Sequence, residues 1–268
     1  KEKNCDQELY VRHYSILAKL YQELNIFDSL VSTCLNGIEA SQKANDYYGL
    51  SRANTDLAAA FSQMGQYDKA IMYYRRGLDA AKKQAKSPTL VALVQTRLSS
   101  QYLSGFEKSG NTVYADSAAW LAKDALDSAA KYHDLLAFLE ANEALASHAL
   151  LTNNDKSAIQ FADVIINTSP KGVHLLDRLI YAGFSKKSEA FLKLKDCASA
   201  ERFADSALLY AQAFNPQMMI GAYENIYNAA KANNNMSKSL AAHEKMVLLK
   251  DSLFTLEKNT SISELEKK

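Results

Sequence analysis

A motif that returns about every 40 residues constrains the fold of this chain more than any other feature. Its clearest copy joins Leu57-Ala58-x-x-Phe61 to the segment Gly65 to Ala70. Equivalent positions of six copies fall at residues 30, 70, 118, 158, 200 and 239, which gives spacings of 40, 48, 40, 42 and 39 residues. A constant long period is typical of stacked repeat units, because each unit buries its apolar face only against its neighbours.

The composition predicts that these units are helical. The 268 residues include 40 Ala and 34 Leu, but only 8 Val, 11 Ile, 9 Gly and 3 Pro. Alanine and leucine favour helices, β-branched residues favour strands, and Gly and Pro interrupt helices. We therefore expect an all-α fold of helix pairs, in which small residues let the backbones approach and Gly65 or Asn pairs at 153–154 and 234–235 form the turns. Each proline follows Ser or Asn and predicts a helix start, at Pro88, Pro170 and Pro216.

The repeat predicts one array over residues 1–246. The helical hairpins are expected near residues 7–44, 47–84, 89–131, 134–168, 171–213 and 216–246. Residues 247–268 are expected to form a separate helix that caps the last unit or links it to a following part. The third unit is longer than the others, and its segment Gly105–Asn111 predicts an exposed loop within residues 105–114. Both a neutral insertion and a binding loop are open for that segment.

The charge balance excludes one class of partner. The chain has 31 Lys and Arg against 30 Asp and Glu, a net charge of +1. Nucleic-acid binding needs a clustered positive field, so we predict no nucleic-acid partner. The longest uncharged stretch, Ser206 to Tyr223, contains Asn215 and Pro216 and does not resemble a membrane span. Contact with a membrane is expected only through segments outside this sequence.

Motifs of catalytic and metal sites are missing from the sequence. There is no Gly-rich phosphate loop, no GxSxG and no HExxH, and the five histidines are dispersed. The cysteines, Cys5, Cys34 and Cys197, form no CxxC pair and are interpreted as free thiols. We therefore expect no enzyme activity, no cofactor and no bound metal.

The repeat resembles the tetratricopeptide repeat (TPR) over about residues 7–250. The match is most specific between Leu57 and Gly77, although the period exceeds the usual 34 residues. The resemblance implies a right-handed α-α superhelix of about six hairpins, whose first helices line a groove for a peptide or protein partner. A small ligand and a second copy of the chain are the other partners considered.

The side of each first helix that faces away from the packing residues predicts this groove. Its expected members are Arg12, Lys19, Gln22, Arg52, Thr55, Gln63, Thr96, Ser100, Glu143, Ser147, Glu189, Lys193, Glu224 and Asn228. The set begins basic and ends mostly acidic, which suits an extended peptide laid head to tail; an ordinary solvated helix face is the alternative. The family's clamp for a C-terminal carboxylate is matched only at Arg97, since Ser15, Asp56 and Leu93 occupy other clamp positions. Binding of chaperone tails is therefore not predicted.

The end of the sequence carries a second resemblance. Leu249–Phe254 followed by Ile262–Lys268 is similar to a junction in Bacteroidetes sensor proteins, in which TPRs precede a helix, a transmembrane segment, and a histidine kinase or DNA-binding output domain. This resemblance implies the periplasmic sensing part of a membrane-anchored signal-transduction protein, as in a two-component system. The alternative is a cytoplasmic TPR scaffold that joins proteins. An apolar span of about 20 residues after Lys268 would separate the two.

Overall fold

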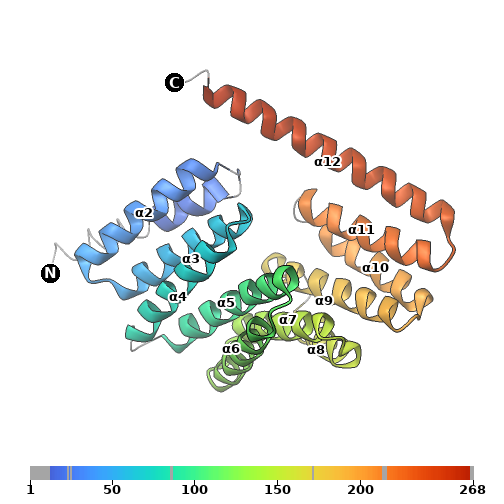
Figure 1. The fold of residues 1–268 in the computed structure, drawn as a ribbon, viewed down its shortest axis with the longest axis horizontal. Helices are drawn as coiled ribbons and strands as arrows, with labels where there is room; N and C mark the ends of the chain where they lie inside the picture. Colours follow the sequence, from blue (N-terminus) through green and yellow to red (C-terminus); the bar gives the residue numbers. More distant parts are fainter. Residues whose placement is uncertain are drawn as a thin grey trace. The chain divides into compact units, whose positions relative to one another are not determined.

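The computed structural model describes residues 13–22, 24, 26–84, 87–170, 172–212 and 216–265. Within these ranges the regular elements are all α-helices, as the composition predicts. Residues 13–22 are helical, and the helices that follow pack in consecutive pairs (Figure 1). They are α2 (Phe27–Ala44), α3 (Tyr47–Gln63), α4 (Tyr67–Lys83), α5 (Pro88–Ser109), α6 (Thr112–Lys131), α7 (Leu135–Leu151), α8 (Asp155–Thr168), α9 (His174–Lys193), α10 (Cys197–Ala211), α11 (Pro216–Ala232) and α12 (Met236–Leu265).

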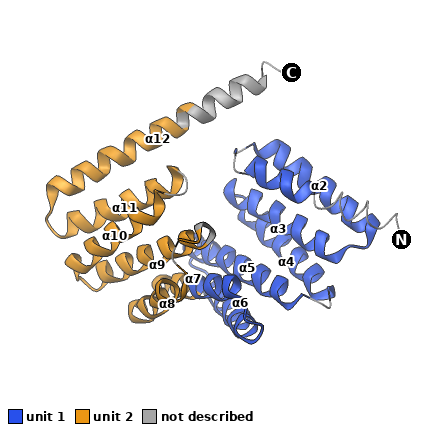
Figure 2. Cartoon of the chain, turned by 180° about the vertical axis from the view of Figure 1, so that it is seen from behind, with its two compact units in different colours: residues 1–144 blue, residues 145–268 orange. Residues whose placement is uncertain are grey.

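The chain divides into two compact units, unit 1 with residues 1–144 and unit 2 with residues 145–268 (Figure 2). In unit 1 the first helices of the hairpins are residues 13–22, α3 and α5, and the second helices are α2, α4 and α6. In unit 2, α9 and α11 are first helices that pair with α10 and α12.

The hairpin turns use residues that tolerate left-handed backbone. Gly65 has φ 72°, and Asn153 and Asn234 both have φ 57°. These are the turn positions that the sequence predicts, because Gly has no Cβ to clash there and Asn accepts this conformation more readily than most residues. The residue after Asn153 then caps the next helix: the Asn154 side chain accepts a hydrogen bond from the Ser157 backbone N–H at 3.4 Å.

The prolines fit the prediction only in part. Pro88 and Pro216 are the first residues of α5 and α11, as expected. The prediction for Pro170 was wrong, because α9 begins at His174. Between them, Gly172 has φ 77° and Val173 is the N-cap, so the chain makes a further turn before the helix can start.

The predicted loop at residues 105–111 was also wrong. Helix α5 continues through Ser109, and only Gly110 and Asn111 separate it from α6. The extra residues therefore lengthen both helices of the hairpin. Contacts of Tyr114 explain the extension: its ring stacks on Tyr102 at 5.7 Å, and a Cβ on Gly105 would lie 3.1 Å from it.

Small residues fill the contacts between helices in both units. In unit 1, Leu30 and Leu57 are almost fully buried beside Ala18 and Ala60. In unit 2, Ala200 and Ala204 pack against Ala229 and other apolar side chains of α11 and α12. Because the alanine side chain is small, two helix backbones can approach closely at these positions, and the many alanines of the sequence lie in such contacts. The helical stretches that the structure describes include none with both the length and the apolarity needed to cross a membrane.

Helix α12 is longer than the second helix of a hairpin requires. It runs for 30 residues, from Met236 to Leu265, without a break at residue 247. Its first part packs on α11 through Ala242 and Met246. The last helix of the repeat and the expected C-terminal helix are thus one continuous helix.

Candidate binding surfaces

A half-buried carboxyl group in unit 1 feels the charges of three cations. Asp56 on α3 is desolvated by its surroundings, and this burial raises the pKa of its carboxyl above the ordinary value. The positive charges of Arg52, Arg97 and Lys19 oppose the rise in the pKa of Asp56. These cations come from three successive first helices: residues 13–22, α3 and α5. We call Lys19, Arg52, Asp56 and Arg97 the Asp56 cluster.

The charge of Asp56 also affects the pKa values of two core side chains, Cys34 and Tyr74. Burial raises the pKa of the Cys34 thiol to about 12, and the charge of Asp56 adds to the rise. Burial likewise raises the pKa of Tyr74 to about 12; Arg97 opposes this rise, while Asp56 and Glu140 add to it. Asp56 lines a small cavity together with Ala18, Cys34 and Ala53. Asp56 and Arg52 are half-buried, whereas Lys19 and Arg97 are exposed.

Two of the predicted groove residues in unit 1 do not reach a groove. Thr55 and Thr96 are only 3% and 2% exposed. The Thr55 hydroxyl donates to the carbonyl of Ser51 at 2.8 Å, and the Thr96 hydroxyl donates to the carbonyl of Leu93 at 2.8 Å. Predicting them as groove residues was wrong, because they lie on sides of α3 and α5 that pack against neighbouring helices.

The remaining predicted residues of unit 1 differ in exposure. Lys19 and Arg52 belong to the Asp56 cluster, while Gln63 and Ser100 are exposed on α3 and α5. Gln22 and Glu143 are half-buried, and Arg12 lies outside the described residues. Arg97, which the sequence indicated only as a clamp match, completes the cluster. The central role of Asp56 was missed. Its one sequence signal is a charged residue directly before the core residue Leu57.

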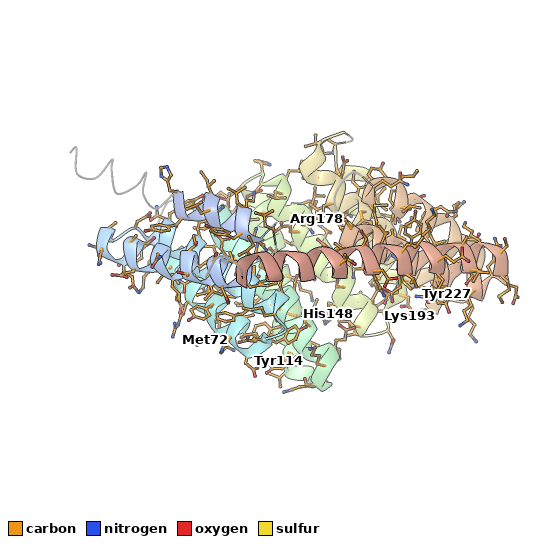
Figure 3. The ribbon with its side chains drawn as sticks, turned by 90° about the horizontal axis from the view of Figure 1, so that it is seen from above. Met72, Tyr114, His148, Arg178, Lys193 and Tyr227 are labelled. Atoms are coloured by element: carbon orange, nitrogen blue, oxygen red, sulfur yellow. The ribbon has the colours of Figure 1, made fainter. Side chains whose placement is uncertain are left out.

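In unit 2 the predicted residues form a less concentrated arrangement. Lys193 on α9 donates to the carbonyl of Leu150 at 2.6 Å and lies 4.0 Å from the Glu189 carboxylate, so it joins α9 to the end of α7. Lys193 and Tyr227, both labelled in Figure 3, lie on the first helices α9 and α11. The other predicted residues here are Ser147, which is half-buried, and Glu224 and Asn228, which are exposed on α11.

A network that the sequence did not reveal holds the start of α12 to α10. The Lys238 ammonium group donates to the carboxylates of Glu201 at 2.8 Å and Asp205 at 2.7 Å. Asn233 and Asn235 also donate to Glu201, at 2.8 and 3.1 Å. Hydrogen bonds from Lys238 and Asn233 lower the pKa of Glu201 below its ordinary value. This network stabilises the last hairpin. In the part of the chain that the structure describes, no three His, Cys, Asp or Glu side chains gather as metal ligands.

Comparisons with known proteins bear on the fold. No protein-family model matches the chain. Over 67 residues it is 34% identical to tetratricopeptide repeat protein 29 of Trypanosoma brucei brucei, a match that covers 25% of this chain and 14% of that protein. The crystal structure of BtubC (BKLC) from P. vanneervenii aligns with 87% of this chain and 92% of its own, with a TM-score of 0.61 and 16% identity. The TPR2AB-domain:pHSP90 complex of yeast Sti1 aligns with 96% of this chain and 97% of its own, with a TM-score of 0.37 and 14% identity.

These findings agree with the repeat that the sequence predicts. A local match to a TPR protein and a fold-level likeness to BtubC accompany helices that pack in consecutive pairs. The fold is therefore all-α and TPR-like. The matched segment spans about one seventh of the T. brucei protein, so it carries no statement about that protein's whole activity. The resemblance to Bacteroidetes sensors stays a prediction.

Proposed function

We propose that this chain is a non-catalytic, TPR-like module that binds an acidic segment of a partner protein on the first-helix face of unit 1. The observation that carries the proposal is the Asp56 cluster, in which the half-buried carboxyl of Asp56 feels the positive charges of three cations from three successive hairpins. With Asp56 ionised, the three cations leave a net charge of +2 for a ligand to neutralise.

The charge of Asp56 bears on how the cluster would bind a ligand. Its carboxylate attracts the guanidinium groups of Arg52 on α3 and Arg97 on α5. A ligand carboxylate would meet the same two arginine side chains, and arginine pairs with carboxylates through two parallel hydrogen bonds. Partner recognition on such a face suits a repeat array, since each hairpin adds one side chain to the surface.

Charge reversal tests this proposal. We expect the Arg52→Glu/Arg97→Glu variant to bind a fluorescein-labelled hexaglutamate peptide at least about tenfold more weakly than the unchanged chain, since like charges now face the ligand. Lys82→Glu is the matched control, because Lys82 is an exposed cation on α4 outside the cluster. Fluorescence anisotropy at 0.15 M salt measures both. Equal affinities of the cluster variant and the control would refute the proposed site.

We also propose, from the resemblance of residues 249–268, that the module is the periplasmic sensing part of a membrane-anchored signalling protein. The continuity of α12 supports this role, because a helix that starts in the last hairpin and continues to Leu265 would carry a displacement onward as a rigid rod. The Glu201–Lys238 network would couple such a displacement to α10.

Protease protection in cells of the source organism tests the compartment. A periplasmic module is cleaved by added protease once the outer membrane is permeabilised, while a cytoplasmic marker protein stays intact. Protection of the module together with that marker would contradict the sensor proposal and favour the cytoplasmic scaffold.

A further inference from the structure

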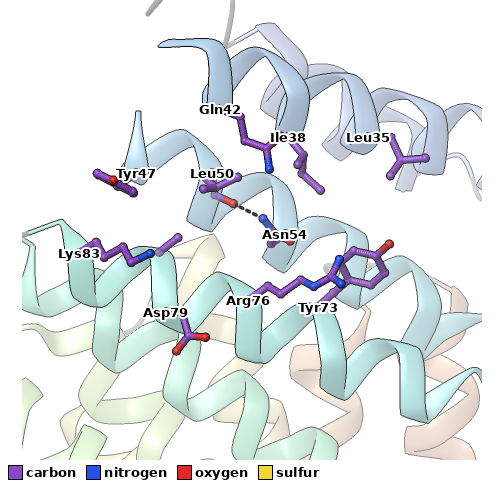
Figure 4. A pocket seen from close by; sticks show the side chains of 11 residues that line it. Leu35, Ile38, Gln42, Tyr47, Leu50, Asn54, Tyr73, Arg76, Asp79 and Lys83 are labelled. Carbon is purple, nitrogen blue, oxygen red and sulfur yellow. Dashed lines mark hydrogen bonds between the residues drawn. The ribbon is translucent and has the colours of Figure 1, made fainter. Parts of the chain in front are cut away.

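A groove on the second-helix side of unit 1 is not used by the proposed function. It has a volume of about 300 Å³ and lies between α2 and α4, with α3 as its floor (Figure 4). Leu35, Ile38 and Leu50 are apolar members of its lining, and Gln42 and Asn54 are polar members. Its lining includes no member of the Asp56 cluster, so the two surfaces can be altered independently.

Each end of the groove has a tyrosine beside a cation. At one end the Arg76 guanidinium lies 5.1 Å from the centre of the Tyr73 ring, and at the other the Lys83 ammonium lies 5.8 Å from the centre of the Tyr47 ring. Figure 4 shows the two pairs at opposite ends of the groove. Contact with an aromatic face restrains a cation without neutralising its charge.

In the part of the chain that the structure describes, Arg76 and Lys83 are not paired with a carboxylate. Among the described residues, no ion pair within 4.0 Å includes Arg76 or Lys83. Asp79 lies between them on the same side of α4, since positions 76, 79 and 83 recur at helical spacing. A third acidic group at the middle of the groove would therefore be repelled, while acidic groups at its two ends would be attracted.

The positions of the two cations along α4 favour an extended occupant. Seven residues of α-helix separate the Cα atoms of Arg76 and Lys83 by about 10.5 Å. In a polyproline-II segment, residues i and i+3 lie on the same side about 9 Å apart, and residues i+1 and i+2 point to the other two sides. Acidic residues at i and i+3 would thus meet the cations of α4, while the residues between them face Leu35, Ile38 and Leu50.

We propose that this groove is a second binding site, for an extended peptide segment with two acidic residues three positions apart and apolar residues between them. Charge complementarity at both ends, the negative charge of Asp79 between them and the apolar side chains of the lining distinguish this occupant from a uniformly acidic peptide. The site is separate from the first-helix face, so it stands even if the first proposal fails.

A designed peptide tests the pattern. The probe is a fluorescein-labelled peptide containing Glu-Leu-Leu-Glu between glycine pairs, and the matched peptides contain Gln-Leu-Leu-Gln and Glu-Glu-Leu-Leu. We expect saturable binding of the first peptide and at least about tenfold weaker binding of the other two, because they lack the charges or their spacing. Absence of saturation at about 1 mM peptide, or equal binding of all three peptides, would overturn the proposal.

Variants of the protein locate the binding. Arg76→Glu/Lys83→Glu is expected to weaken the Glu-Leu-Leu-Glu affinity at least about tenfold, while Lys82→Glu changes it by less than about twofold, because all three side chains are exposed cations on α4 but only two line the groove. The Arg52→Glu/Arg97→Glu variant is expected to bind this peptide normally. Loss of binding in that variant would assign the peptide to the first-helix face and overturn the second site. Analytical ultracentrifugation tests the remaining occupant. If the unchanged chain sediments as a dimer and the Arg76→Glu/Lys83→Glu variant sediments as a monomer, the groove binds a second copy of the chain and the peptide proposal is overturned.

Discussion

Gly77 lies where α4 packs closely on α3, and its replacement by alanine tests this packing directly. A Cβ at position 77 would lie 2.9 Å from the Thr55 hydroxyl oxygen and 3.2 Å from the Ser51 carbonyl oxygen. Neither atom moves easily. The carbonyl belongs to the helix backbone, and Thr55 is β-branched, with its hydroxyl already bonded to Ser51 at 2.8 Å. The added methyl group must therefore push the two helices apart or turn the Thr55 side chain.

Two opposing terms set the size of the effect. Alanine is a better helix former than glycine by about 1 kcal/mol. Overpacking of a closely packed contact costs about 1–3 kcal/mol. We expect Gly77→Ala to lower the free energy of unfolding by about 0–2 kcal/mol, although propensity alone would raise it. Thr55→Ala removes the nearest obstructing atom. The free energy of unfolding of the double variant is therefore expected to be at least about 1 kcal/mol higher than the sum of the two single effects predicts.

Urea unfolding followed by circular dichroism measures the four members of this cycle. The dependence of the unfolding free energy on urea should stay constant, which indicates that the folded state remains equally compact. Thr55→Ala alone serves as the control for the lost hydrogen bond to Ser51. A Gly77→Ala variant stabilised by about 1 kcal/mol, together with additive effects in the double variant, would refute the close contact. It would also reopen the assignment of Thr55 to the packed side of α3.

Four further predictions follow from individual residues. Phe61→Ala should cost about 2–4 kcal/mol in urea unfolding, because the half-buried ring packs against the core; an unchanged melt would refute the repeat register. Asp56→Asn should raise the free energy of unfolding at pH 7. The pKa of Asp56 is higher in the folded than in the unfolded chain, so its ionised carboxylate opposes folding at pH 7. The stabilisation by Asn should therefore shrink as the pH falls towards about 4, where the carboxyl becomes protonated. An equal effect of the substitution at pH 7 and pH 4 would contradict this. Glu201→Ala should cost about 2 kcal/mol at neutral pH. Because the folded pKa of Glu201 is lowered, that cost should decrease as the pH falls below about 4.5 and through the folded pKa, and a pH-independent cost would exclude the bond to Lys238 as its source. The thiol of Cys34, buried and with its pKa raised to about 12, should react with a maleimide only when the chain unfolds; mass spectrometry of native and urea-treated protein checks this.

Local sequence signals were sufficient for the helices and most of their turns. Gly65, Asn153 and Asn234 adopt the left-handed conformation that the pattern predicts, since this property depends on the residue itself. The segment after Gly105 has the same polar, glycine-containing composition, yet it is helical. Its conformation depends on contacts of the Tyr114 ring with neighbouring residues of α5, and residue composition alone does not reveal such a contact.

The candidate binding face was harder to predict than the helices. A helical projection gives the direction of a side chain around its own axis, but the exposed arc depends on how many neighbouring helices pack against it. Helix α3 packs against both α2 and α4, and α5 packs against both α4 and α6. The arc left to solvent is narrow as a result, and Thr55 and Thr96 fall outside it although their neighbours Arg52 and Ser100 lie at least partly within it.

The near-zero net charge of the chain also conceals where charge is available for binding. Glu201 is already bound by Lys238, and Asp56 is half-buried beside Lys19, Arg52 and Arg97, so a formal sum of charges does not show which cations remain available to a ligand. Arg76 and Lys83, by contrast, are exposed and restrained by tyrosine rings rather than by carboxylates. Unit 1 thus carries two sets of cations, Lys19, Arg52 and Arg97 on one side and Arg76 and Lys83 in the groove, in a chain whose charges sum to +1. A partner with paired acidic residues would be attracted to these surfaces even though it would experience little attraction to the molecule from a distance.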